Sequence, residues 1–205
     1  MKVKSINEVF KKRKGKILGD YKEFAVMILI CRENKEEYII LEKRALTLRK
    51  QPGDICLPGG KIENNETPLE GAIRESCEEL NIERKDIEYV GEMDYLVTPY
   101  GSIMHVFVSY VNSYPNNFNK DEVHSLMKIP LKYFLNNEPQ VYTMNIGPLN
   151  YDEFPFHLIE GGKDYKFSAG TLNQYFYSYK ESNIWGFTAR IIKSFIDYIK
   201  ENDIE

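Results

Sequence analysis

The stretch of residues 60–82 constrains this chain more than any other. Its second half predicts a helix in which Glu75, Glu78 and Glu79 stand at positions i, i+3 and i+4 and project from one face. The apolar residues of that helix recur on a different arc, centred roughly 140° from the carboxylates at about 100° per residue. They are Leu69, Ala72, Ile73 and Leu80. The helix is therefore expected to pack by one face and to concentrate negative charge on the other.

Three carboxylates within one helical turn repel one another, although such a helix face is commonly just solvated surface. Carboxylate oxygens are also the ligands that hard divalent cations prefer, and Mg²⁺ usually completes its coordination with waters and substrate phosphates. Just before the helix, Gly59 and Gly60 follow Leu57 and Pro58, and glycines allow a close approach of the backbone to a ligand. These flanks favour a metal platform for phosphate chemistry over the solvated face.

The same stretch resembles the signature of the Nudix hydrolases: Gly, five residues, Glu, seven residues, Arg-Glu, a bulky aliphatic, any residue, Glu-Glu, any residue, Gly, and a bulky aliphatic. The positions that match at the family's spacing are Gly60, Glu66, Arg74, Glu75, Glu78, Glu79 and Ile82. Two positions depart, because Ser76 replaces the aliphatic residue and Asn81 replaces the glycine. Asn tolerates the left-handed conformation that ends many helices, so Asn81 can still cap this one.

A second resemblance, to the Nudix hydrolases that act on coenzyme A, covers both flanks of this box. Upstream, the matching residues are Arg44, Leu48, Arg49, Gly53, Asp54, Ile55, Leu57, Pro58, Gly59 and Gly60. Gln51 stands where that branch commonly has His. Downstream, the resemblance continues at Glu122-Val123, at Pro130-Leu131 and in residues 184–189. Together the two resemblances reach from about residue 24 to residue 199.

The resemblance implies one Nudix domain over residues 1–205, with an α/β fold in which helices cover both faces of a mixed β-sheet as an α/β/α sandwich. The residues agree, since a continuous apolar run at 24–30 predicts a strand that is buried on both faces. Further strands are expected at residues 38–44, 86–98, 103–112, 154–159 and 165–168. Apolar spacing predicts a C-terminal helix over about residues 184–201.

The resemblance also implies the reaction, which is hydrolysis of coenzyme A or an acyl derivative to 3′,5′-ADP and 4′-phosphopantetheine with Mg²⁺ or Mn²⁺. The implied metal ligands are the Gly60 carbonyl and the carboxylates of Glu75, Glu78 and Glu79. These three glutamates are also implied to be catalytic residues. Arg74 is expected to hold Glu75 or Glu66 in a productive rotamer. Glu122 is a candidate fourth ligand or general base, and an exposed loop acid is the alternative.

Three cations just upstream of the glycines, Arg44, Arg49 and Lys50, are candidate substrate-binding residues. A planar guanidinium can meet two phosphate oxygens at once, which suits an extra phosphate such as the 3′-phosphate of coenzyme A. The alternative is an ordinary charged loop. Nudix hydrolases of other substrates, namely ADP-ribose, dinucleoside polyphosphates and oxidised nucleotides, share the whole box and are an alternative. A non-catalytic nucleotide-binding module is a further alternative, but it would have no need for three repelling carboxylates.

Composition narrows the partners of the chain. A net charge of −4 argues against broad nucleic-acid binding, because phosphate backbones are bound by an excess of Lys and Arg. Cys31, Cys56 and Cys77 show no CxxC spacing and predict reduced, buried thiols. The sequence shows neither the apolar core of a signal peptide nor a long apolar run, so we expect a cytoplasmic protein without membrane attachment. The predicted partner is a small nucleoside diphosphate substrate, and a homodimer stays open.

Overall fold

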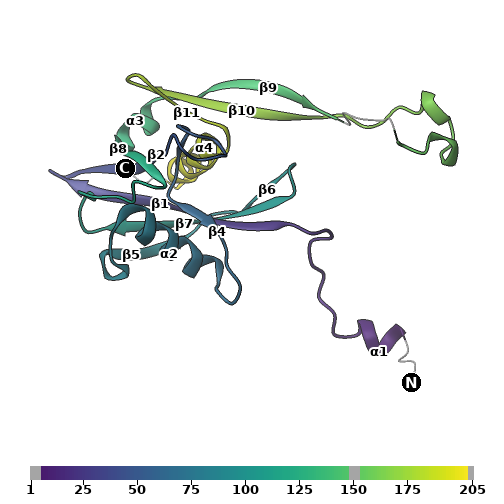
Figure 1. Ribbon diagram of the computed structural model, residues 1–205, viewed down its shortest axis with the longest axis horizontal. Coiled ribbons are helices and arrows are strands. Elements are labelled where there is room, and N and C mark those ends of the chain that lie inside the picture. The colour runs from purple at the N-terminus through teal and green to yellow at the C-terminus, as the bar shows by residue number, and fades with distance from the viewer. Residues whose placement is uncertain (1–5, 148–152, 203–205) are drawn as a thin grey trace.

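Figure 1 shows the computed structural model of the chain, which describes residues 6–147 and 153–202. Among these residues, eight strands form one mixed sheet: β1 (Lys22–Glu33), β2 (Glu36–Arg44), β3 (Ile55–Cys56), β4 (Gly59–Lys61), β5 (Ile87–Glu92), β6 (Leu96–Thr98), β7 (Ser102–Val111) and β8 (Val123–Pro130). A smaller sheet has the order β11 (Ser182–Trp185), β10 (Gly170–Tyr179), β9 (Gln140–Ile146). The helices are α1 (Ile6–Phe10), α2 (Pro68–Leu80), α3 (Leu131–Asn136) and α4 (Gly186–Glu201), with short 3₁₀ turns η1 (Arg84–Asp86), η2 (Phe156–Leu158) and η3 (Gly162–Asp164).

Strand β1 lies at the centre of the large sheet. It pairs in parallel with β7 and antiparallel with β2 and β4, which makes the sheet mixed, as predicted. Residues 25–31 of β1 are all buried, so the apolar run is a strand covered on both faces. Strands β3 and β8 pair with β2, and β5 and β6 pair with β7. The strand expected at residues 86–98 is interrupted between β5 and β6.

Alternate side chains of β1 point to two separate cores. Met27 and Leu29 pack with the apolar face of α2, and Ile28 and Ile30 belong to the core that α4 covers. In Figure 1, α2 and α4 accordingly lie on opposite sides of β1. The α/β/α sandwich implied by the sequence is confirmed.

Helix α2 has a cap at each end, and the Asn81 cap at its C-terminus agrees with the expectation from the sequence. Thr67 and Glu70 form a capping box, in which the Thr67 hydroxyl accepts a hydrogen bond from the Glu70 backbone N–H and the Glu70 carboxylate accepts one from the Thr67 N–H. Pro68 occupies the first turn. Asn81 adopts φ of 49° at the C-terminus, the left-handed conformation that the family's glycine would take.

The second half of the chain departs from prediction. The strands expected at residues 154–159 and 165–168 are wrong, because residues 156–158 form the 3₁₀ turn η2 and the actual strands are β9 and β10. Pro155 lacks a backbone N–H for a ladder, and Gly161 and Gly162 adopt positive φ, which breaks an extended chain. The C-terminal helix begins at Gly186 rather than at 184, since the preceding residues belong to β11.

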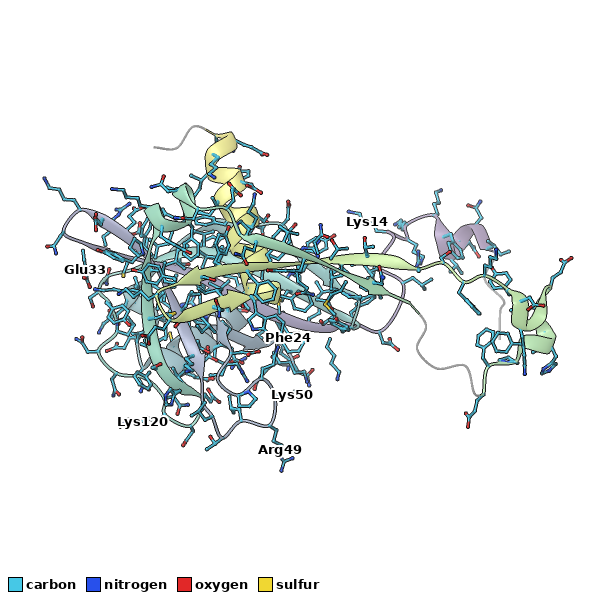
Figure 2. The ribbon with its side chains drawn as sticks, turned by 90° about the horizontal axis from the view of Figure 1, so that it is seen from above. Lys14, Phe24, Glu33, Arg49, Lys50 and Lys120 are labelled. Atoms are coloured by element: carbon cyan, nitrogen blue, oxygen red, sulfur yellow. The ribbon has the colours of Figure 1, made fainter. Side chains whose placement is uncertain are left out.

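Two segments extend away from the sandwich, as Figures 1 and 2 show: the β9–β10 ribbon with the turn beyond it, and the N-terminal segment with α1. Within the part of the chain that the structure describes, no helix combines the length and the apolar character needed to cross a membrane. The cytoplasmic location and the homodimer stay predictions.

Candidate active site

Two glycines bring the backbone of β4 against its neighbours. Gly59 has φ of 143°, and a Cβ there would lie 2.3 Å from the Ala25 carbonyl oxygen, so the antiparallel pairing with β1 requires glycine. A Cβ on Gly60 would lie 2.4 Å from the carboxyl carbon of Glu75. The carboxylate of Glu75 is therefore packed directly on the Gly60 backbone. This contact places the acidic face of α2 against the glycine strand, as the proposed metal set requires.

Glu79 is the most buried carboxylate of α2, with 4% of its surface exposed. Its Oε2 accepts a hydrogen bond of 2.8 Å from the Gly59 N–H. Burial, and after it the charge of Glu42, raises the pKa of Glu79 well above its ordinary range. A negative charge at Glu79 is therefore costly until a cation is supplied.

Arg74 links three of the predicted residues. Its Nε and Nη2 donate to Glu66 at 3.1 and 2.8 Å, and its Nη1 donates to Glu75 at 3.0 Å and to Glu78 at 3.1 Å. Hydrogen bonds from Arg74 and from the Glu63 N–H lower the pKa of Glu66 to about 2. Sequence reasoning left Glu75 and Glu66 as alternatives for Arg74, and the structure shows that it holds both. Charge-assisted contacts of this kind fix the rotamers of the carboxylates.

Glu122 lies in the turn that leads into β8, and backbone hydrogen bonds attach this turn to the site. The Asn119 N–H donates to the Glu79 carbonyl at 2.8 Å, and the Ala45 N–H donates to the Glu122 carbonyl at 2.8 Å. Burial is the main cause that raises the pKa values of Glu42, Glu75 and Glu79, and the nearby charge of Glu122 adds to it for all three. We call Glu42, Glu66, Glu75, Glu78 and Glu79 the acidic cluster. The structure thus brings Glu122 to this cluster, although its side chain is exposed.

Sequence reasoning missed Glu42 on β2, which is 1% exposed. Its Oε1 accepts a hydrogen bond from the Cys56 thiol at 3.3 Å, and its Oε2 is buried without a partner among the described residues. Side chains alternate along a strand, so Glu42 shares a face with Ile40, which packs in the core beneath α2. That alternation, applied to the strand predicted at residues 38–44, was the signal that could have found it.

The three predicted substrate cations separate into two groups. Arg44 is half-buried close to Glu42, and its charge lowers the pKa of Glu42 against the larger effect of burial. Arg49 and Lys50 are exposed in the loop between β2 and β3, and Figure 2 shows Arg49 reaching outward from that loop. Within the described ranges neither forms an ion pair. Only Arg44 therefore lies at the acidic cluster.

The donor set suits a hard divalent cation. Glu42, Glu75, Glu79 and Glu122 lie close enough together that, after burial, their charges raise the pKa values of Glu42 and Glu79, and Oε2 of Glu42 is buried without a hydrogen-bond partner among the described residues. In residues 6–147 and 153–202, however, no three ligating side chains are arranged to hold a metal as they stand. Arg74 engages Glu75 and Glu78, so those two carboxylates must turn toward a cation that binds.

All three cysteines are free thiols, Cys31 buried and the other two half-buried. Burial raises the pKa of each thiol. They are therefore protonated near neutral pH.

Comparison with known proteins gives concordant matches. The model of the NUDIX domain family matches residues 22–143, more than half of the chain. A mouse protein, peroxisomal coenzyme A diphosphatase NUDT7, is 30% identical over 149 residues, which are 67% of this chain and 58% of that protein. An Escherichia coli protein, uncharacterized Nudix hydrolase NudL, is 26% identical over 182 residues, which are 85% of this chain and 81% of that one.

Among solved structures, a MutT/nudix family protein from Enterococcus faecalis matches with a TM-score of 0.53 at 14% identity, over 97% of this chain and 70% of that chain. Identity at that level shows the fold alone. The chain spans less than two thirds of the length of the mouse relative.

Proposed function

This chain belongs to the Nudix family of hydrolases, and we propose that it cleaves the diphosphate of coenzyme A or its acyl derivatives to 3′,5′-ADP and 4′-phosphopantetheine. Nudix hydrolases act on small nucleoside diphosphates and use divalent metal ions. The contact of Glu75 and Glu79 with the two glycines of β4 is the observation that carries the hydrolase site. The choice of coenzyme A is supported by the match on both flanks of the box and by the mouse relative.

Glu75, Glu78 and Glu79, with the Gly60 carbonyl, are the residues that would hold Mg²⁺ or Mn²⁺. A divalent cation held there would supply charge neutralisation for the diphosphate and would make a water easier to deprotonate. Glu42 adds a buried carboxylate to the same region and increases its negative potential.

Residues of the chain itself position the carboxylates and the attacking water. Arg74 holds Glu75 and Glu78 through its Nη1, donates to the Lys61 carbonyl of β4 through its Nη2, and is a positioning residue. Glu122 is exposed on a turn fixed at both ends, where it can accept a proton from the water that attacks phosphorus. Glu79, enclosed beneath the glycine strand, acts in a region of low dielectric, where its charge interacts strongly with a bound cation.

A substrate panel with product identification tests the proposal. Coenzyme A, 3′-dephospho coenzyme A, ADP-ribose and a dinucleoside polyphosphate are incubated with the full chain and Mg²⁺ or Mn²⁺. We expect coenzyme A to give 3′,5′-ADP and 4′-phosphopantetheine with the highest specificity constant. A Glu79→Gln preparation, purified in parallel, controls for a contaminating hydrolase. Equal cleavage of the two coenzyme A forms, or a preference for ADP-ribose, would remove the coenzyme A assignment and leave family membership intact.

A further inference from the structure

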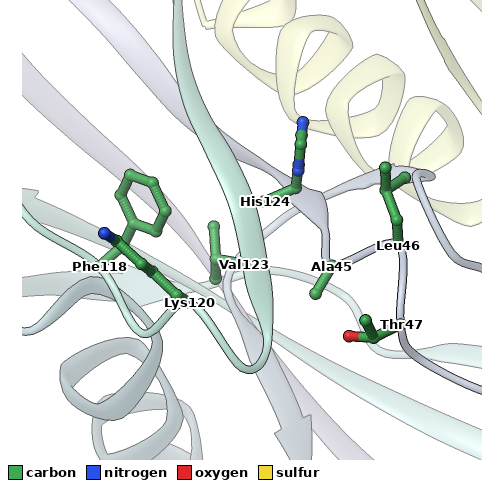
Figure 3. A pocket seen from close by; sticks show the side chains of 7 residues that line it. All are labelled: Ala45, Leu46, Thr47, Phe118, Lys120, Val123 and His124. Atoms are coloured by element: carbon green, nitrogen blue, oxygen red, sulfur yellow. The ribbon is translucent and has the colours of Figure 1, made fainter.

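An open cavity of about 270 Å³ lies between the segment that follows β2 and the turn that enters β8. One wall is formed by residues 45–47, and the other by Phe118, Lys120, Val123 and His124. Figure 3 shows Phe118 and Lys120 on one side, Leu46 and Thr47 on the other, and Ala45 and Val123 between them. Of the seven lining residues, only Val123 belongs to the resemblance found downstream of the box.

Backbone contacts join this cavity to the acidic cluster. The turn at residues 119–122 carries Glu122, and the Asn119 N–H in this turn donates a hydrogen bond of 2.8 Å to the Glu79 carbonyl. On the opposite wall, the Ala45 N–H donates a hydrogen bond of 2.8 Å to the Glu122 carbonyl. Val123 is the register partner of Arg44. A ligand group in the cavity therefore lies next to the residues proposed to act on the diphosphate.

The lining combines an apolar portion with cationic and polar groups. The ring of Phe118 and the side chain of Leu46 present apolar surface, against which a flat base can pack. Lys120 is exposed and forms no ion pair within the described part of the chain, so its ammonium is free for a phosphate. The neighbouring cluster is rich in carboxylates, which disfavours a phosphate that no cation accompanies. Lys120 lies outside the acidic cluster, so it is suited to bind a substrate phosphate that takes no part in the cleavage.

The size of the cavity limits what it can take. Pockets for whole drug-sized ligands span about 300 to 1,000 Å³, so a cavity of about 270 Å³ accommodates only one end of a molecule as long as coenzyme A. We propose that this cavity binds the 3′-phosphorylated nucleoside end of the substrate, an inference that rests on the proposed function. Lys120 meets the 3′-phosphate and Phe118 packs against the base, while the diphosphate lies at the acidic cluster.

Two nucleotides that differ only in the phosphate in question test this directly. Adenosine 3′,5′-bisphosphate and adenosine 5′-monophosphate are titrated calorimetrically into the full chain. The unmodified protein should bind the bisphosphate about three- to tenfold more tightly, the lower end reflecting the exposure of Lys120. Lys120→Met keeps the aliphatic stem and should bring this ratio close to one, whereas Lys120→Arg should retain it. Lys132→Met, which removes an exposed cation on α3, is the matched control and should leave the ratio unchanged.

A second variant separates the base from the phosphate. Phe118→Leu should weaken both nucleotides several-fold and equally, because the base is common to them. A Lys120→Met protein that keeps the full preference for the bisphosphate, or an unmodified protein without any preference, overturns the proposal.

The outcome is distinguishable from failure of the proposed function. If coenzyme A is cleaved but Lys120→Met leaves its advantage over 3′-dephospho coenzyme A intact, the cavity assignment is wrong and the function stands. If coenzyme A is not cleaved but the bisphosphate preference depends on Lys120, the cavity assignment stands as a nucleotide site and the function is wrong.

Discussion

The acidic cluster has two halves that deal with charge repulsion in different ways. In one half, the guanidinium of Arg74 contacts Glu66, Glu75 and Glu78 and holds the pKa of Glu66 at about 2. In the other half, Glu42 and Glu79 are almost fully buried, and burial raises both pKa values. Arg74 compensates the negative charge of the paired half, although burial still raises the pKa of Glu75. The buried half holds a full negative charge only when a cation compensates it.

This difference assigns different work to carboxylates that look alike in the sequence. Glu66 and Arg74 maintain the shape of the helix face, so their loss acts through the position of other groups. Glu79 carries a charge that is unfavourable in the folded protein and becomes favourable with a bound cation. The dependence of folding stability on a bound metal should therefore be greatest for the buried half.

The largest expected effect is on catalysis by the metal-facing carboxylates. Glu79→Gln and Glu78→Gln should each lower the turnover rate by a factor on the order of 10² to 10⁴. A chelator should abolish hydrolysis, and added Mg²⁺ or Mn²⁺ should restore it. Steady-state kinetics measures the loss, and circular dichroism checks that the fold is intact. Full activity in either variant would mean that this helix face is ordinary surface.

Glu122 tests whether a residue outside the helix completes the site. As a general base it acts mainly in the transition state, so Glu122→Gln should lower the turnover rate by about 10²-fold and leave the Michaelis constant little changed. Asp121→Asn, on the same exposed turn, is the matched control and should retain activity. Unchanged turnover in Glu122→Gln would return this residue to the role of a solvated loop acid.

The pH dependence of stability separates the two halves of the cluster. Because the folded pKa values of Glu42 and Glu79 are raised, the unfolded chain releases protons near pH 4 to 5 that the folded protein still binds. The metal-free protein should therefore lose stability as the pH rises from 6 to 8, by at most about 1.4 kcal/mol per pH unit for each group. The contribution of Glu66 has the opposite sign: it is present above its unfolded pKa and is lost only in strong acid, as the pH falls toward about 2.

Urea midpoints at several pH values, with and without Mg²⁺, measure this effect. Glu42→Gln should make the fall between pH 6 and 8 less steep, because it removes one of the raised pKa values. Mg²⁺ should stabilise the protein more at pH 8 than at pH 6, since it binds the deprotonated carboxylates. Stability that rises between pH 6 and 8 without metal would contradict the division into a paired and a buried half.

The same contrast explains what the sequence could predict. The position of α2, its caps and the reach of Arg74 follow from local spacing, because residues three to eight apart are fixed relative to one another once the helix begins. Glu42 was predictable from alternation along β2, with the buried neighbour Ile40 as its guide. Both features depend on the fixed period of a helix or a strand.

Other features carry no such signal. Residues 140–145 of β9 are all exposed, so no alternation between buried and exposed positions marks that strand. The cavity beside Glu122 is created by two loops joined through backbone hydrogen bonds, which any side chain permits. The contact of the Cys56 thiol with the Glu42 carboxylate likewise depends on the pairing of β2 with β3, which spacing along the chain does not specify.

The smallest expected effect concerns the cations outside the cluster. Arg49 remains a predicted substrate contact, but it is exposed and reaches outward from its loop, so a phosphate contact there is largely screened. Arg49→Ala should narrow the advantage of coenzyme A over 3′-dephospho coenzyme A by about twofold, compared with about three- to tenfold for Lys120→Met. Specificity constants for both substrates, measured at two salt concentrations, give the comparison, and the Arg49 effect should shrink further at high salt. If Arg49→Ala narrows the ratio more than Lys120→Met does, the 3′-phosphate is read by the loop between β2 and β3 and not by the cavity.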